Sequence, residues 1–213
     1  MLILFYGNCQ IGCIFETLIL PNKYEKEYIR CWTKKIDKKY FTDLINKADI
    51  IITQSINNNY RGFEYLSTKY IKENKKDICK LIIVDICYFT FYHFDSTYKI
   101  INNKKIYEPA DYHYNEMINC YKNNKSIKYY VSMFVNNMNL KSSKELETLA
   151  NNNFKELEKR HKNSIEKYND NNIYFIGITE YIKKNYKDIL LFYTINHPTK
   201  YLVHFLCEEI IKI

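Results

Sequence analysis

The sequence predicts an α/β fold of three layers, in which helices dominate and surround a short parallel sheet. Apolar runs rich in β-branched residues alternate with helical patterns, which is typical of strands that are covered on both faces. The 213 residues include only 4 Gly and 3 Pro, too few for the frequent hairpins of a β-sandwich or barrel. In such a fold the loops at the carboxyl ends of the strands form the site.

Four strands and three helices are predicted in the first 90 residues. Met1 to Tyr6 is apolar throughout, and Ile11, Ile14 and Leu18 then recur at helical spacing. The run Ile50-Ile51-Ile52 has the character of a buried parallel strand. The predicted strands are 1–6, 27–32, 48–53 and 80–88, and the later helices are 37–47 and 60–70.

The rest of the chain is predicted to be mainly helical. We expect one domain over 1–213, with an irregular aromatic excursion near 89–110 that covers the site and a helical region at 111–186. Helices are predicted at 111–121, 141–168 and 201–211, and a short segment at 173–178 is either a strand or the start of a helix.

The basic charge does not indicate a nucleic-acid partner. The formal net charge is +8, but the lysines are scattered in pairs such as Lys34-Lys35 and Lys104-Lys105, as on solvated faces. Nucleic-acid-binding modules concentrate basic residues, preferably arginine, in one stripe. The chain has only three arginines: Arg30, Arg61 and Arg160.

Cysteine usage favours a reducing compartment. The 7 cysteines lie mostly inside apolar runs, with no C-x-x-C pair and no zinc-ligand spacing, so we expect neither disulfides nor a metal. The apolar start lacks a basic region and is interrupted by Gly7 and Asn8, unlike a signal peptide or membrane span. These features predict a soluble, cytoplasmic protein, and leave the oligomeric state open.

The segment Gly7-Asn8-Cys9-Gln10 is the strongest candidate for a catalytic turn. It lies where a strand ends and a helix begins, so the thiol of Cys9 is near helix N-terminal amides that favour the thiolate. Asn8 has an amide that can stabilise an oxyanion. The alternatives are a cysteine packed under the sheet and a redox pair with Cys13.

His197 is the best candidate for a base that acts with Cys9. Pro198 favours an extended backbone before it and the start of a helix after it, which places the imidazole at a loop tip. Cys and His together are the minimum for nucleophilic acyl transfer. A structural role for His197 at the helix start is an equal alternative, and His113 is the rival base or a residue that binds substrate.

Several segments together resemble the WcbI family of polysaccharide-biosynthesis acetyltransferases. They are Gly7-Asn8-Cys9-Gln10, Asp49 followed by Gln54, Tyr60-Arg61, Tyr112-His113, and the run from Thr194 to Thr199. Their order and rough spacing cover nearly the whole chain. One departure is that Val84-Asp85-Ile86-Cys87-Tyr88 stands where a proline-containing segment is expected, so the loop on the substrate side is expected to differ.

The resemblance implies a fold of the SGNH-hydrolase and flavodoxin-like type, a coenzyme A site beside the turn, and a Cys9–His197 dyad. The implied activity is transfer of acetyl from acetyl-CoA to a sugar hydroxyl in glycan or capsule-like polysaccharide synthesis. Either Cys9 carries the acetyl group, or His197 activates the sugar for direct attack. An esterase or deacetylase of acetylated glycans and a non-catalytic binding protein are the alternatives.

The expected site residues fall into three groups besides the dyad. Asn8 and Gln54 are expected to support the oxyanion. Gly7, Gln10 and Arg61 are expected to bind the cofactor, with Arg61 making bidentate contacts to a phosphate of CoA. The residues expected to bind the sugar are Tyr60, Tyr112, His113 and Asn196.

Overall fold

The chain forms two compact units. A computed structural model describes residues 1–101, 104–106, 112–133 and 142–213. The first unit combines Met1–Tyr88 with Phe154–Ile213, and the second is Phe89–Asn153. The predicted excursion begins where the second unit begins, and its residues 102–103 and 107–110 lie outside the described part, as do Asp111 and Lys141 of two predicted helices.

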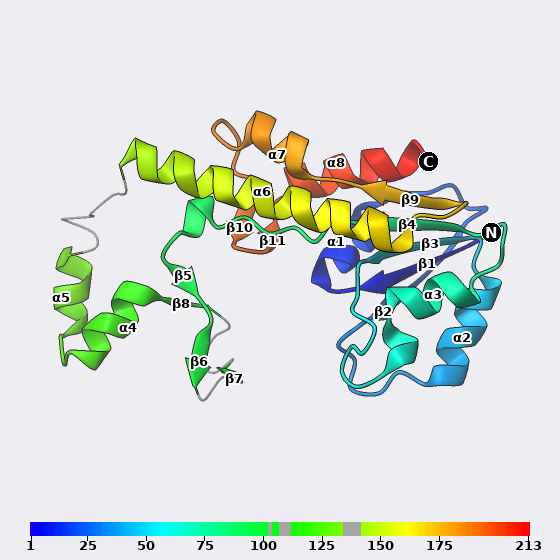
Figure 1. Cartoon of the computed structure of the whole chain (residues 1–213), viewed down its shortest axis with the longest axis horizontal. Coiled ribbons are helices and arrows are strands. Elements are labelled where there is room, and N and C mark those ends of the chain that lie inside the picture. The colour runs from blue at the N-terminus through cyan, green and yellow to red at the C-terminus, as the bar shows by residue number, and fades with distance from the viewer. Residues whose placement is uncertain (102–103, 107–111, 134–141) are drawn as a thin grey trace. The chain divides into compact units, whose positions relative to one another are not determined.

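A five-stranded parallel sheet, drawn in Figure 1, forms the centre of the first unit. Its strands are β1 (Leu2–Gly7), β2 (Glu25–Arg30), β3 (Ile50–Gln54), β4 (Lys80–Val84) and β9 (Ile173–Ile176). They lie in the order β2-β1-β3-β4-β9, so the direction of winding reverses between β1 and β3, the point where open α/β sheets bind ligands. The predicted α/β fold with a parallel sheet is confirmed.

Helices cover both faces of this sheet. They are α1 (Cys9–Thr17), α2 (Lys38–Lys47), α3 (Thr68–Asn74), α6 (Ser143–Tyr168, from Phe154 on in this unit), α7 (Thr179–Asn185) and α8 (Lys200–Ile211). Side chains of β1 point alternately to the two faces: Tyr6 packs on Phe41 of α2, with 4.6 Å between ring centroids, and Phe5 packs on Phe15 of α1 at 5.3 Å. Burying each such ring stabilises the fold by about 1.5–3 kcal/mol.

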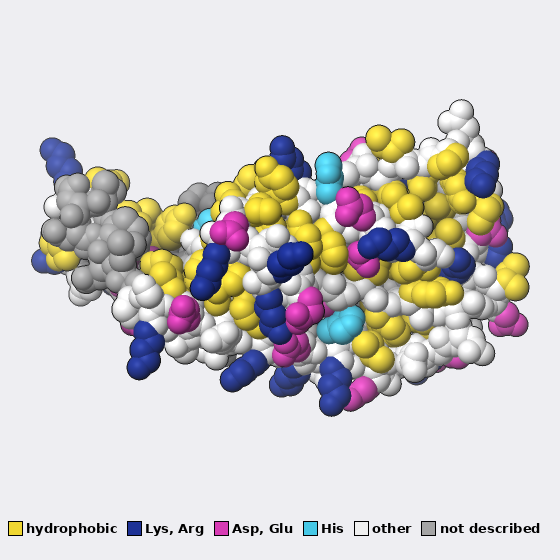
Figure 2. All heavy atoms as spheres, turned by 90° about the horizontal axis from the view of Figure 1, so that it is seen from above, with side chains coloured by type: hydrophobic (Ala, Val, Ile, Leu, Met, Phe, Trp, Pro, Cys, Tyr) yellow, Lys and Arg dark blue, Asp and Glu magenta, His cyan; other side chains and the backbone are white. Residues whose placement is uncertain are grey.

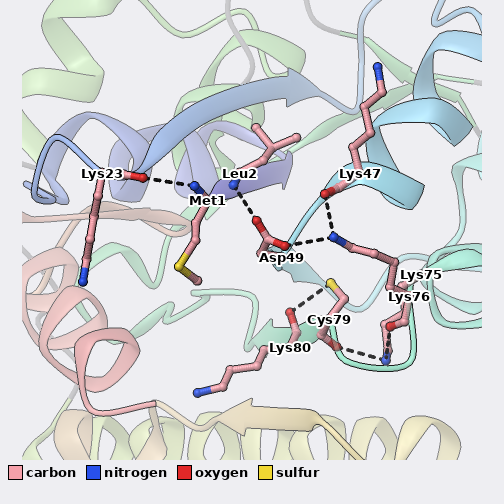
Figure 3. Close-up of polar contacts among 9 residues, drawn as sticks. All are labelled: Met1, Leu2, Lys23, Lys47, Asp49, Lys75, Lys76, Cys79 and Lys80. Atoms are coloured by element: carbon pink, nitrogen blue, oxygen red, sulfur yellow. Dashed lines mark hydrogen bonds and ion pairs between the residues drawn. The ribbon is translucent and has the colours of Figure 1, made fainter.

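Polar contacts fix the amino-terminal edge of the sheet, as Figure 3 shows. The carboxylate of Asp49 accepts hydrogen bonds of 2.9 Å from the backbone N–H of Leu2 and from Nζ of Lys76. Lys76 also donates to the backbone carbonyl of Lys47. The Lys76 and Leu2 bonds lower the pKa of Asp49. Asp49 therefore joins β1 to β3 at the edge opposite the Gly7-Asn8-Cys9-Gln10 turn.

The predicted helix at 60–70 is largely wrong. Arg61 and Gly62 have positive φ angles of 56° and 82°, which an α-helix does not contain. The segment instead forms a tight turn and a 3₁₀ helix at Glu64–Leu66. Helix α3 begins only at Thr68, where Ser67 caps it by accepting a hydrogen bond from the N–H of Tyr70.

Two further boundaries differ from the sequence prediction. Strand β4 ends at Val84 rather than Tyr88, because the backbone of Cys87 leaves the sheet to bind the side chain of Gln10. Tyr112-His113 does not open a helix, since His113–Tyr114 form the strand β8 and the helix α4 begins at Asn115.

The second unit consists of short elements and the start of α6, from Ser143 to Asn153. Strand β5 (Ser96–Thr97) pairs antiparallel with β8, and β6 (Lys99–Ile101) pairs with β7 (Lys104–Ile106). The helices are α4 (Asn115–Lys122), α5 (Ile127–Val131) and a 3₁₀ helix at Phe91–His93. The two ends of the unit are joined, because the N–H of Thr90 donates a 3.0 Å hydrogen bond to Oδ1 of Asn153.

Charged side chains of both signs are interspersed on the face seen in Figure 2, with no single basic stripe. This distribution agrees with the interpretation of the lysines as solvated. Among the described residues, no helix has both the length and the apolar character needed to cross a membrane.

Candidate active site at the carboxyl edge of the sheet

Close packing shapes the turn between β1 and α1. A Cβ atom on Gly7 would lie 2.5 Å from Cγ1 of Ile11 and 3.3 Å from Oε1 of Gln54, so only glycine lets the helix return this closely over the strand. Asn8 caps α1, with its Oδ1 accepting a 2.9 Å hydrogen bond from the N–H of Gln10. The Nδ2 group of this half-buried Asn8 makes no hydrogen bond within the described part of the chain.

Gln10 joins four segments at this edge. Its Nε2 donates to the backbone carbonyls of Cys87 at 2.8 Å and Asn196 at 2.7 Å. Its Oε1 accepts from the N–H of Cys87 at 2.9 Å and from Nε2 of Gln54 at 2.8 Å. Gln54 in turn accepts from the N–H of Asn8 at 3.3 Å.

Both glutamines are only 2% exposed. A primary amide has two donor hydrogens and two acceptor lone pairs, and in Gln10 all four are used within the protein. The structure therefore leaves this amide no capacity to bind a cofactor directly. Its effect is to hold the ends of β1, β3 and β4 against the segment that carries His197.

His197 lies in a short hairpin formed by β10 (Phe192–Thr194) and β11 (His197–Pro198). Its Nδ1 is 2.6 Å from Oγ1 of Thr194, and the same hydroxyl donates a longer, 3.4 Å bond to Oδ1 of Asn196. With its one proton directed to Asn196, the hydroxyl of Thr194 can accept a hydrogen bond from Nδ1–H of His197. The Nε2 atom then carries the lone pair that a general base needs.

The hydrogen bond from Gln10 to Asn196 places the two candidate catalytic residues on neighbouring segments. Cys9 precedes Gln10 by one residue, and His197 follows Asn196 by one residue. The bond spans 186 positions of the chain, yet both segments belong to the first unit. The Cys9–His197 dyad itself stays a prediction, which this arrangement supports.

A pocket of about 430 Å³ opens beside Cys9. Its other lining residues come from α1 and from the end of β2, namely Gly12, Cys13, Glu16, Thr17, Tyr28, Arg30 and Trp32. The hydroxyl of Tyr28 donates a 2.9 Å hydrogen bond to the carbonyl of Asn8, which holds β2 against the turn. The pocket offers a thiol, a guanidinium and an indole that is 43% exposed.

Burial raises the pKa of Cys9, and the neighbouring Cys13 raises it further. The backbone amides of Cys9 and Gln10 lower it, in the direction predicted from the helix N-terminus, but burial outweighs them. The amides therefore act in the predicted direction, but the net pKa shift of Cys9 favours the thiol rather than the thiolate. Cys9 needs a base to remove its proton near neutral pH.

Two other predicted site residues contact the segment that follows β2. Arg61 donates from Nη1 to the carbonyl of Thr33 at 2.5 Å, and the hydroxyl of Tyr60 lies 3.6 Å from Sγ of Cys31. Tyr112 and His113 belong to the second unit, so their contact with a sugar stays a prediction. Arg30 and Thr194 have no role in the sequence prediction, although Thr194 lies in the segment that carries the family resemblance.

Comparison with known proteins identifies the family. Residues 2–213 match the family described as polysaccharide biosynthesis enzyme WcbI. The chain belongs to the WcbI family. A solved structure of WcbI superposes with a TM-score of 0.82 at 17% sequence identity, covering 99% of this chain and 68% of that one. That structure is described as the native protein without a disulfide bond between coenzyme A and a cysteine. Comparison with curated proteins found no significant match.

Membership confirms the resemblance drawn from the sequence and places the chain among enzymes of polysaccharide biosynthesis. The description of that solved structure thus names coenzyme A together with a cysteine of WcbI. Within the described ranges, no three His, Cys, Asp or Glu residues are grouped as a metal site would require.

Proposed function

We propose that this WcbI-family protein transfers an acetyl group from acetyl-CoA to a sugar hydroxyl in polysaccharide biosynthesis. The observation that carries the proposal is the hydrogen bond between Gln10 and Asn196, because it holds the segments of Cys9 and His197 together at the ligand-binding edge of the sheet. A Cys–His pair at such an edge suits acyl transfer.

In the covalent version, His197 removes the proton of Cys9 through Nε2, and the sulfur attacks the thioester carbonyl of acetyl-CoA. The C–S bond to CoA breaks, and the departing thiolate takes the proton from His197. The sugar hydroxyl then attacks the acetyl group on Cys9 while His197 accepts the hydroxyl proton. The Cys9 thiolate leaves and recovers its proton from His197, so the enzyme returns to its starting state.

In the direct version, His197 deprotonates the sugar hydroxyl, which attacks acetyl-CoA itself, and Cys9 only shapes the pocket. The raised pKa of Cys9 is compatible with both versions. In the covalent version His197 deprotonates the neutral thiol, and in the direct version the thiol stays protonated. In either version Asn8 is the favoured oxyanion donor, because its Nδ2 group makes no hydrogen bond to the described residues.

The pocket beside Cys9 fits coenzyme A by its chemistry. Arg30 can pair with a phosphate, Trp32 presents an indole face, and the thiol end of the ligand would meet Cys9. The description of the solved WcbI, which names coenzyme A together with a cysteine, supports this assignment. We assign the phosphate contact first to Arg30, with Arg61 as the second candidate, and we assign Gln10 and Gln54 to positioning.

Isothermal titration calorimetry with CoA and acetyl-CoA tests the proposal. We expect saturable binding and a higher Tm, because a ligand that binds only the folded state stabilises it. Incubation of the acetyl-CoA complex with and without mixed sugar acceptors should release CoA faster when acceptor is present. Release at the same rate without acceptor would favour the hydrolase, and no binding at millimolar CoA would overturn the proposal.

A further inference from the structure

A second pocket lies at the same edge of the sheet, beyond the ends of β3 and β4. It has a volume of about 360 Å³ and is lined by polar residues of three segments. The lining residues that matter here are Ser55, Asn57, Asp85, Arg160, Ser164 and Lys167. All belong to the first unit. None of them lines the pocket beside Cys9.

Asp85 is the unusual residue of this pocket. Its side chain is only 9% exposed, and its Oδ1 lies 3.0 Å from Nδ1 of His161. The His161 ring packs flat on Gly177, where a Cβ would lie 3.1–3.3 Å from three ring atoms. Thus a glycine on one side and a carboxylate on the other fix the ring, and the ring fixes Asp85.

The second oxygen of Asp85 has no hydrogen-bond partner among the described residues, although it is fully buried. Oγ of Ser164, which also lines the pocket, has none either. Leaving a buried polar atom unpaired is unfavourable, and more so for a charged group. Two such atoms at one pocket indicate a ligand site, in which a small movement of these side chains lets a bound ligand supply the missing hydrogen bonds.

The chemistry of the lining restricts the ligand. An ionised carboxylate only accepts hydrogen bonds, so the group that meets Asp85 must be a donor such as a hydroxyl. Lys167, by contrast, offers a cation that lies over the ring of Tyr168 and makes no ion pair with a described residue. Arg160 adds a second cation that is shared with Glu156. A ligand with several hydroxyls and a negative group satisfies both requirements.

We propose that this pocket binds an anionic sugar, with ring hydroxyls at Asp85 and Ser164 and the negative group toward Lys167 and Arg160. The two pockets flank the Gln10–Gln54 hydrogen bond, because Ser55 follows Gln54 and Asp85 precedes Cys87 by two residues. That this sugar is the acetyl acceptor rests on the proposed function, whereas binding of the sugar to this pocket is independent of it.

Ligand-observed NMR with glucuronate, glucose 6-phosphate and glucose as probes tests the site. Both charged sugars should bind about tenfold more tightly than glucose, and Lys167→Gln should remove that advantage. The matched control is Lys162→Gln, the same change on the same helix at a side chain that is 77% exposed and outside the pocket. Equal loss in both variants, or no preference for either charged sugar, would overturn the proposal. A preference for only one of them identifies the anion, carboxylate or phosphate.

Asp85→Asn separates binding from structure. It should weaken all three sugars about tenfold, because an amide nitrogen cannot accept from a hydroxyl, while CoA binding stays unchanged. A variant that loses thermal stability but keeps sugar affinity shows a purely structural Asp85 and overturns the assignment. Saturating CoA should leave sugar binding intact, and displacement of the sugar by CoA would place both in one site. If CoA binds and no sugar does, this inference fails and the proposed function stands.

Discussion

The side-chain amide of Gln10 donates a 2.7 Å hydrogen bond to the backbone carbonyl of Asn196. The contact joins the start of the first helix to the hairpin that precedes the last one. Since Cys9 and His197 flank its two ends in the sequence, the geometry of the proposed dyad depends on a residue that is itself too buried to touch substrate.

Replacing Gln10 with Met should therefore damage both stability and turnover. The methionine has a similar volume, but it leaves the carbonyls of Cys87 and Asn196 without their donor, and we expect the free energy of unfolding to fall by about 1–3 kcal/mol or more. Urea unfolding measures this loss. Glu16→Met, at an exposed position of the same helix, is a control for stability alone, because Glu16 lines the Cys9 pocket. It should change the free energy of unfolding by less than about 0.5 kcal/mol. A fully stable, fully active Gln10→Met variant would contradict the assigned role.

Thr194 is expected to orient His197 without touching substrate. Thr194→Val keeps the shape and removes the hydroxyl at Nδ1, so kcat should fall about tenfold or more while KM for acetyl-CoA changes little. Thr194→Ser, which restores the hydroxyl, should recover most of the rate. If the valine and serine variants have the same kcat, the 2.6 Å contact between Thr194 Oγ1 and His197 Nδ1 does not contribute to catalysis.

The two arginines in the amino-terminal half of the chain, Arg30 and Arg61, lead to different predictions. Arg30 lines the Cys9 pocket, whereas Arg61 is held by the carbonyl of Thr33. Arg30→Gln should weaken CoA about ten- to a hundredfold, as the loss of a charge-assisted hydrogen bond does. Arg61→Gln should have a smaller effect in the same calorimetric titration. Comparing CoA with dephospho-CoA shows which phosphate is contacted, and the reverse ranking would return the role to Arg61.

Asp49 should make stability depend on acid pH. Because its pKa is lowered in the folded state by Lys76 and the Leu2 amide, its contribution is present above the unfolded value of about 3.9 and is lost as pH falls through the folded value. Asp49→Asn should lower the stability at pH 7 by about 0.5–1 kcal/mol, since the pair is partly exposed. The difference from wild type should shrink toward pH 3. Asp43→Asn, at an exposed helix pair, serves as the control.

The sheet was predictable because short runs of apolar, β-branched residues, such as Ile50-Ile51-Ile52, indicate its strands. The turn at Gly7 was predictable for the same reason, since a strand and a helix meet there. By contrast, Arg61 adopts a positive φ angle, which is unusual for a residue other than glycine. The neighbouring sequence contains no pattern that predicts this conformation. The predicted helix there failed accordingly.

The site was harder to predict because its contacts are not local. Gln10 is bound to Cys87 and Asn196, and nothing in the spacing of these residues indicates a bond between a side chain and backbone carbonyls. Burial of Cys9, which decides the direction of its pKa shift, is likewise a property of the assembled fold. The same holds for Asp85: its Oδ1 is paired with Nδ1 of His161, 76 positions away in the chain, and its Oδ2 is left without a partner among the described residues.

The central claim, that Cys9 and His197 act as one unit, is tested most directly by the turnover of three variants with acetyl-CoA and acceptor. Cys9→Ala, His197→Ala and the double variant should all fall to about the same residual rate, because residues that share one step are strongly non-additive. Retained activity in Cys9→Ala with loss in His197→Ala would select the direct version. Losses that multiply in the double variant would contradict the dyad.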